Sequence, residues 1–273
     1  MKAEFSLAHL TVLGCAPPEM VYIASVCGYD YVSIRPIYMG LAGEPNYDLA
    51  NKKDMLSQTK NALSQTGLRV HDIELARILD DFDVKDYLPA MEVGAELGAK
   101  SLLTSIWTDD KSLYTEKFHE LCELAKPFGL NVDLEFVTWA GVKDLKQTVE
   151  VLEATTETNK GIMIDTLHFN RSRVQLDELD GLPPEWFNFA HICDAGAEIP
   201  TTKEGLVFTG RDERYYVGEG AINIDEIIKR IPRQVVYSIE LPHIERVKEL
   251  GYTEHARRCL ETAKEYFNKK VFK

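Results

Sequence analysis

The sequence predicts an α/β protein, a single (β/α)8 TIM barrel that spans residues 1–273. Three observations favour this fold: short β-rich runs alternate with helical segments from end to end, glycine-containing turns precede many of the runs, and the length of 273 residues suits one barrel. No linker or low-complexity stretch divides the chain. An open doubly wound sheet is the alternative, but the first turn, HLTVLGCAPPE, lacks the glycine pattern typical of that fold.

The expected strands are eight runs rich in β-branched and aromatic residues. They cover residues 3–8, 30–35, 68–74, 101–106, 131–136, 161–165, 187–192 and 235–240. Helical periodicity predicts helices over residues 18–27, 49–65, 84–97, 113–127, 142–155, 224–231 and 254–268. The turns CGYD, QTGL, ELGAK and PFGLN stand just before strands, where a glycine suits the end of the preceding helix. The unit after the sixth strand leaves room for only a short helix.

The segment from 194 to 219 has little periodicity and is expected to be a long loop after the seventh strand. Such loops build the C-terminal rim of a barrel, where active sites lie. Arg214, beside two tyrosines and the GEG turn at 218–220, is expected to face the site. Arg211 is expected to face solvent with the other charges of GRDER.

Charge and composition exclude several classes of partner. The net charge of −13 disfavours binding to nucleic acid or to an anionic membrane. The N-terminus has no secretory signal pattern, and no run approaches the ~18 apolar residues of a membrane span. The five cysteines are scattered and form no C-x-x-C pair, which fits a reducing compartment. We therefore expect a cytoplasmic protein with no nucleic-acid or membrane partner; the sequence leaves open whether it forms a homo-oligomer.

Four polar residues at the ends of apolar runs predict a metal site: Glu135, Asp165, His191 and Glu240. In a parallel barrel all strand C-termini point to one rim, so these residues converge there. The set has oxygen and nitrogen ligands without a thiolate, which favours one divalent ion, Mn²⁺ first, with Mg²⁺, Co²⁺ or Zn²⁺ as alternatives. The alternative is that each is a separate buried polar residue with its own hydrogen-bond partner.

A metal with open positions can bind the carbonyl and adjacent hydroxyl of a polyol and stabilise an enediolate. Removing the intervening proton and returning it on the opposite face requires two proton-transfer groups. Glu135 and Glu240 are predicted to be that catalytic pair.

Other polar residues at predicted strand ends are expected to reach the same rim pocket and to bind substrate: His9, Arg35, Glu74 and Trp107. Glu74 is predicted to be a substrate contact or a further acid or base. For Arg35 and Glu74 the alternative is an ion pair between adjacent strands. Trp107 is expected to stack on a sugar ring or to be a core aromatic.

The segments that carry a family resemblance span nearly the whole chain: SLAHLTV, PPEMVYIASVCGYDYVSIR, DLEF, IDTLH, HICDA, RYYVGEGAINIDEI and SIELP. With them the chain resembles the xylose-isomerase-like TIM-barrel superfamily of sugar phosphate isomerases and epimerases, which also includes inosose dehydratases, ketose 3-epimerases, dehydroshikimate dehydratases and endonuclease IV. The resemblance implies the same four metal ligands. It also implies that His168 of D-x-x-H lies near substrate and that Arg214 of R-x-x-x-G-E-G holds a substrate oxygen.

The leading hypothesis is a divalent-metal-dependent isomerase or epimerase that acts on a small-molecule sugar, keto-sugar or polyol. The absence of a Gly-rich phosphate-binding loop favours a non-phosphorylated substrate. The main alternative is a metal-dependent dehydratase of the inosose or dehydroshikimate type. A non-catalytic sugar-binding barrel is disfavoured because all four ligand positions are filled. An endonuclease IV-like DNA repair enzyme is disfavoured by the acidic charge and by the lack of any histidine between His191 and Glu240.

Overall fold

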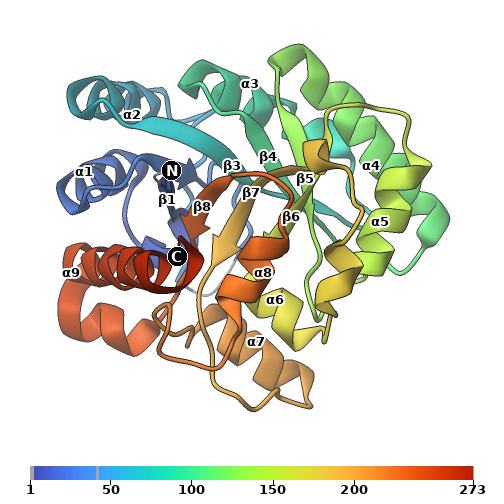
Figure 1. Cartoon of the computed structure of the whole chain (residues 1–273). Coiled ribbons are helices and arrows are strands. Elements are labelled where there is room, and N and C mark those ends of the chain that lie inside the picture. Colours follow the sequence, from blue (N-terminus) through green and yellow to red (C-terminus); the bar gives the residue numbers. More distant parts are fainter. Residues whose placement is uncertain (1–2, 41–42, 273) are drawn as a thin grey trace.

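The strands close into a barrel in which each strand runs parallel to its neighbours. A computed structural model describes residues 3–40 and 43–272, and within them β1 pairs with β2 on one side and with β8 on the other. The strand order around the barrel is the order along the chain (Figure 1). The predicted (β/α)8 barrel is therefore confirmed.

The strands lie close to the predicted runs, with one important extension. They are β1 (Phe5–Ala8), β2 (Tyr31–Ile34), β3 (Arg69–Ile78), β4 (Ser101–Ile106), β5 (Asn131–Glu135), β6 (Lys160–Asp165), β7 (Phe187–Ile192) and β8 (Val236–Ile239). β3 continues four residues beyond the predicted end at Glu74. The prediction that Glu74 ends its strand is therefore wrong, because the pairing of β3 with β4 resumes at Ala76 and continues to Ile78.

The helices form a ring around the barrel (Figure 1). They are α1 (Pro17–Cys27), α2 (Lys53–Thr66), α3 (Leu88–Leu97), α4 (Lys111–Ala125), α5 (Leu145–Ala154), α6 (Thr166–Arg171), α7 (Lys203–Arg211), α8 (Ile224–Arg230) and α9 (Ile244–Tyr266). The short helix after the sixth strand is confirmed as α6. α9 begins ten residues before its predicted start, with a break at Gly251, and packs against α1.

The segment predicted to be a loop from 194 to 219 contains a helix, α7. Thr202 caps its N-terminus by accepting a hydrogen bond from the Gly205 backbone N–H at 3.1 Å. Periodicity did not reveal α7 because Gly210 is its one buried residue, so the helix carries no apolar stripe.

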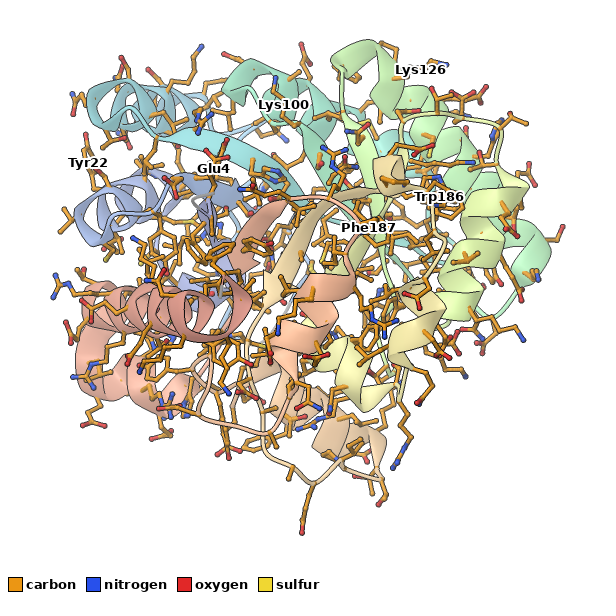
Figure 2. The ribbon with its side chains drawn as sticks, viewed as in Figure 1. Glu4, Tyr22, Lys100, Lys126, Trp186 and Phe187 are labelled. Atoms are coloured by element: carbon orange, nitrogen blue, oxygen red, sulfur yellow. The ribbon has the colours of Figure 1, made fainter. Side chains whose placement is uncertain are left out.

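Two apolar cores hold the barrel. The larger core lies between the strands and the helices, where residues such as Phe118 and Phe136 are fully buried. The smaller core lies inside the barrel. Successive side chains of a strand point to opposite faces, and the inward-pointing residues of this core are Leu75, Leu103, Met163, Phe189 and Val236. Outer side chains such as Tyr22 and Lys126 are exposed, whereas Phe187 at the start of β7 is buried (Figure 2). None of the helices in the described residues has the length and apolar character needed to cross a bilayer.

Candidate active site at the C-terminal rim

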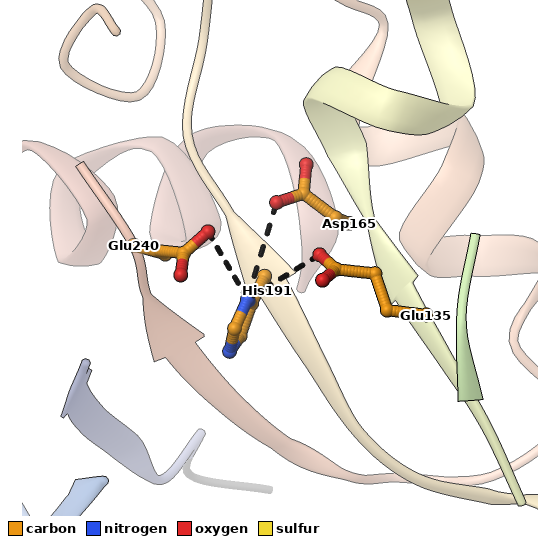
Figure 3. Close-up of side chains that lie close together, drawn as sticks. All are labelled: Glu135, Asp165, His191 and Glu240. Atoms are coloured by element: carbon orange, nitrogen blue, oxygen red, sulfur yellow. Dashed lines mark ion pairs between the residues drawn. The ribbon is translucent and has the colours of Figure 1, made fainter. Parts of the chain in front are cut away.

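The four predicted metal ligands stand at the C-terminal ends of neighbouring strands. Glu135 and Asp165 are the last residues of β5 and β6. His191 is the penultimate residue of β7, where it pairs with Asp165 across the sheet, and Glu240 directly follows β8. Figure 3 shows their side chains pointing toward one another. The structure therefore brings together all four residues that the sequence singled out.

The distances within this cluster suit a single ion. His191 Nδ1 lies 3.4 Å from Glu240 Oε2, 3.9 Å from Asp165 Oδ2 and 4.0 Å from Glu135 Oε1. One ligand atom from each residue lies within 4.8 Å of the others, and all four residues are buried. We refer to these four residues as the rim cluster.

Unpartnered atoms in the rim cluster fit a metal ion. Both ring nitrogens of His191 and the Oε1 atom of Glu135 are buried and have no hydrogen-bond partner within residues 3–40 and 43–272. Buried polar atoms are normally paired, so these are candidates for metal ligation. The set of three carboxylates and one imidazole matches the ligands that divalent ions take.

The electrostatics of the rim cluster are also compatible with a bound cation. Burial and then the charges of Glu240 and Asp165 raise the pKa of Glu135 well above its usual value. Burial alone would lower the pKa of His191, but Glu240 and the other carboxylates outweigh it and raise the pKa to about 10. Metal ligation requires a neutral imidazole. A divalent ion would therefore replace the proton that the carboxylates otherwise hold on His191.

Arg214 lies inside the site, as predicted, and forms ion pairs with two members of the rim cluster. Its Nη1 atom donates to Asp165 Oδ2 at 2.7 Å, and its Nη2 atom lies 2.8 Å from Glu240 Oε2. Its Nε atom donates to the Gly210 carbonyl at the end of α7 at 2.7 Å. The buried guanidinium therefore neutralises part of the acidic cluster and ties it to α7.

Asp165 divides its two oxygens between a helix and the site. Oδ1 caps α6 by accepting hydrogen bonds from the backbone N–H groups of Leu167 at 2.6 Å and His168 at 3.1 Å. This leaves Oδ2 for the cluster and for Arg214. The D-x-x-H sequence thus places His168 on the first turn of α6, beside the site.

His168 borders the pocket, as the resemblance implied. Its Nδ1 atom accepts a hydrogen bond from the Thr138 backbone N–H at 3.3 Å, so the proton of the neutral ring is on Nε2. Burial lowers the pKa of His168 to about 4, which keeps the ring neutral. Its ring centre lies 4.8 Å from that of Trp139 in an edge-to-face contact.

The pocket above the rim cluster is narrow. It has a volume of about 50 Å³ and is lined by residues that include Arg35, Trp107, Trp139, Arg211 and Arg214 as well as Glu135 and Glu240. Trp107 is half-buried, and its Nε1 donates to Ser105 Oγ at 2.8 Å, which fixes the ring at the pocket wall. The placement of Trp107 at the wall is as predicted; the stacking on a sugar ring stays a prediction.

Arg35 and Glu74 form the ion pair that the sequence left as an alternative. Arg35 Nη2 lies 2.8 Å from Glu74 Oε2, and both side chains are buried. Burial raises the pKa of Glu74 to about 7, although the charge of Arg35 opposes this. Arg35 borders the pocket, whereas Glu74 is not among the residues that line it. A direct contact of Glu74 with substrate stays a prediction.

His9 is fully buried next to Arg35 and is not among the residues that line the pocket. Its Nδ1 accepts from the Arg35 backbone N–H at 3.0 Å, and Nε2 lies 2.9 Å from the Cys15 carbonyl oxygen. The ring also stacks on Tyr47 at a centroid distance of 5.4 Å. In this position His9 supports the backbone that carries Arg35.

The prediction that Arg211 faces solvent is wrong. Arg211 is half-buried and lines the pocket, with its guanidinium carbon 5.9 Å from the ring centre of Trp107 and 6.0 Å from that of Trp139. It was missed because α7 was missed. Trp139 was also missed, although its place four residues after Glu135, in the segment that follows β5, was a usable signal.

Comparisons with known proteins agree with the barrel fold. A family model described as a xylose isomerase-like TIM barrel matches residues 21–263. The chain is 28% identical over 252 residues to an inosose isomerase of Halalkalibacterium halodurans, covering 87% of this chain and 85% of that protein.

Two solved structures share the fold. One is an IolI protein with a bound zinc atom, with a TM-score of 0.82 and 20% identity over 99% of this chain and 100% of the other. The second is a 3-keto-D-glucoside 4-epimerase, YcjR, from E. coli in its apo form, with a TM-score of 0.72 and 15% identity over 95% of this chain and 100% of the other.

Proposed function

We propose, from the premise that this chain belongs to the xylose isomerase-like TIM barrel family, that it is a divalent-metal-dependent isomerase or epimerase. Its substrate in this proposal is a small sugar, keto-sugar or polyol. The observation that carries the proposal is the convergence of Glu135, Asp165, His191 and Glu240 within 4.8 Å at the barrel rim. The inosose isomerase and the sugar epimerase to which the chain is similar support the same class of reaction.

The rim cluster would hold the metal. Bound there, a divalent ion would polarise the carbonyl and the neighbouring hydroxyl of the substrate and lower the free energy needed to remove the proton between them. The set of ligands, three oxygens and one nitrogen, favours Mn²⁺, Mg²⁺ or Co²⁺. The zinc atom in the IolI protein structure is a reason to include Zn²⁺ among the ions tested.

Glu135 and Glu240 are the proposed proton-transfer pair, and their surroundings differ. Glu240 Oε2 is engaged by Arg214 at 2.8 Å and faces His191, and these charges hold the pKa of Glu240 below its usual range against the effect of burial. Glu135 has an oxygen without a hydrogen-bond partner in the described residues and a raised pKa. Two carboxylates whose pKa values are shifted in opposite directions take different acid–base roles. The two carboxylates therefore suit different acid–base roles, and the glutamine variants described below decide which of them takes the proton first.

The remaining residues of the pocket position the substrate. Arg214 fixes Asp165 and Glu240 in place and would also donate a hydrogen bond to a substrate oxygen. His168 carries a proton on Nε2 and is a hydrogen-bond donor at the same wall. Trp107 and Trp139 give the pocket apolar faces that suit the C–H side of a sugar ring and exclude water.

The experiment is a solvent-exchange assay of the metal-loaded protein in D2O with 3-keto-sugars, inososes and dehydroshikimate. Deuterium incorporation without loss of water identifies an isomerase or epimerase, whereas loss of water identifies the dehydratase alternative. Glu135→Gln or Glu240→Gln should lower exchange by about 100-fold or more, because a general base is lost.

Glu123→Gln is the matched control, since Glu123 is an exposed carboxylate far from the rim on α4. A variant that exchanges deuterium but forms no product identifies the reprotonating group. Full exchange in both rim variants would refute the two-carboxylate mechanism and leave Glu74 and His168 as the next groups to test.

A further inference from the structure

Arg211 stands between two neighbouring cavities. The inner cavity is the pocket above the rim cluster, with a volume of about 50 Å³. The outer cavity has a volume of about 260 Å³ and is lined by residues that include Leu13, Pro242 and Tyr252. Leu10 and Arg211 line both. Ligand pockets usually have about 300 Å³ or more, so a ligand of sugar size would extend from the inner cavity past Arg211 into the outer one.

Arg211 forms no ion pair within residues 3–40 and 43–272, although the charges of Asp212 and Glu240 act on it. The other two arginines that line the inner cavity are paired: Arg35 with Glu74 and Arg214 with Asp165 and Glu240. Neither Arg211 nor Arg77 has a carboxylate within ion-pair distance in the described part of the chain; Arg77 Nη2 instead donates to the Met39 carbonyl oxygen at 3.1 Å. Burial and then the charges of Arg77 and Arg35 lower the pKa of Arg211. A positive charge therefore remains at Arg211, between the two cavities, although the protein carries a net charge of −13.

Local effects explain the position of Arg211 only in part. A cation at the C-terminal end of a helix is favourable, and so is one near aromatic rings. The helix end would favour the cation equally well with the guanidinium directed into solvent. Neither effect explains why Arg211 lies near Arg77 and Arg35, whose positive charges disfavour its own. An anion bound at Arg211 would offset this repulsion.

The end of α7 holds Arg211 in a fixed place. A Cβ atom at Gly210 would lie 2.3 Å from Trp139 Cη2, so the absence of a side chain lets the indole pack directly against the helix. The Asp212 carbonyl accepts a hydrogen bond from the Ile244 backbone N–H at 3.0 Å. With the Arg214 bond to Gly210, these contacts preorganise the cation and limit the entropy lost when a ligand binds.

We propose that Arg211, strengthened by the nearby charge of Arg77, forms a subsite for an oxyanion, a carboxylate or a phosphate ester, at one end of the substrate. The proposal rests on the proposed function in that it seats the polyhydroxy part of the same substrate over the rim cluster. Two further donors of the inner cavity, Trp139 Nε1 and Arg35 Nη1, are buried and have no hydrogen-bond partner within residues 3–40 and 43–272. They are placed to bind oxygens of the same ligand, and a guanidinium suits both kinds of oxyanion.

The test compares three probes by isothermal titration calorimetry of the metal-loaded protein: D-glucitol, D-gluconate and D-glucitol 6-phosphate. They share a polyhydroxy chain and differ in the end group. In the wild type at least one anionic probe should bind about tenfold more tightly than D-glucitol, and added salt should reduce the difference. Preference for gluconate identifies a carboxylate, and preference for the phosphate identifies a phosphate ester.

Arg211→Gln should abolish this preference and leave D-glucitol binding within about twofold, whereas Arg211→Lys should keep part of it. Arg69→Gln is the matched control, because Arg69 also lies over an aromatic ring, 4.1 Å from the centre of Tyr31, but at the opposite end of the barrel. Circular dichroism checks that each variant is folded.

Three outcomes would overturn the subsite: equal binding of all probes by the wild type, no binding of either anionic probe, or an unchanged preference in Arg211→Gln. The last would assign the anion to the metal instead. The proposed function fails separately. A charge preference that depends on Arg211, together with no solvent exchange on any keto-sugar, would contradict the isomerase and leave the subsite in place.

Discussion

At the scale of single residues, His9 was predicted to reach the rim pocket but instead holds the backbone of Arg35, which lines that pocket. A backbone N–H of Arg35 donates to Nδ1, so the proton of the neutral ring must be on Nε2, where it is donated to the Cys15 carbonyl. If Nδ1 were also protonated, its N–H would face the backbone N–H of Arg35, and this hydrogen bond would be lost. Burial lowers the pKa of His9 to about 4, although the bond to Cys15 opposes this.

This arrangement gives a prediction with a definite sign. Above pH 6.5 His9 is neutral in both the folded and the unfolded chain, and its two hydrogen bonds contribute fully. Between pH 6.5 and about 4 the unfolded chain takes up a proton that the folded protein does not, so stability falls as the pH falls.

His9→Gln removes this titration and weakens both bonds. Its destabilisation should be on the order of 2–3 kcal/mol at pH 7 to 8 and should shrink toward pH 4. Urea unfolding of both proteins across this range measures the difference. A destabilisation that stays constant with pH would show that His9 is not kept neutral by the fold.

At the scale of elements, the segment after β7 depends on one carboxylate. Asp194 Oδ1 accepts from the backbone N–H groups of Ala195 at 2.8 Å and Ile222 at 3.0 Å. Oδ2 accepts from those of Gly218 and Gly220, each at 3.0 Å. Asp194 therefore holds the GEG turn, and a backbone pair with Tyr215 fixes the residue next to Arg214. Sequence inspection placed HICDA in the family pattern but gave its aspartate no role.

Asp194→Asn should loosen this segment. An amide has one acceptor oxygen, so two of the four bonds are lost and an NH2 group faces backbone donors. The expected loss of stability is about 2–4 kcal/mol, with faster proteolysis between 212 and 222 and lower turnover. Asp212→Asn is the control in the same segment, because the Asp212 side chain accepts no hydrogen bond in the described residues. Similar proteolysis of both variants would argue against the anchoring role of Asp194.

At the scale of the whole molecule, the barrel and the rim cluster could both be predicted from the sequence. Strand and helix periodicities are local signals, and parallel strands bring their C-terminal ends together without further information. Three features could not be predicted: the burial of Glu74 within β3, the presence of helix α7, and the position of Arg211. They depend on a β3 strand that continues past Glu74 and on a Trp139–Gly210 contact between distant segments. Neither feature leaves a periodic signal in the chain.

The division between core and rim predicts how the molecule responds to metal. The four members of the rim cluster belong to neither apolar core, so a chelator should leave the barrel folded. A metal ion that binds the folded state alone adds about 2.7 kcal/mol of stability at a concentration 100 times its Kd. For a chain of this size that corresponds to a rise in Tm of roughly 5–10 °C.

His191→Ala should abolish this rise and most of the bound metal while circular dichroism stays that of a barrel. His119→Ala is the matched control, because His119, Glu123 and Glu157 form a second group of suitable spacing that is not buried. Removing His119 should leave both the metal content and the Tm shift intact, since water competes for exposed ligands. An equal Tm shift in the wild type and in His191→Ala would locate the ion outside the rim cluster. Unfolding of the wild type by the chelator would instead give the ion a structural role.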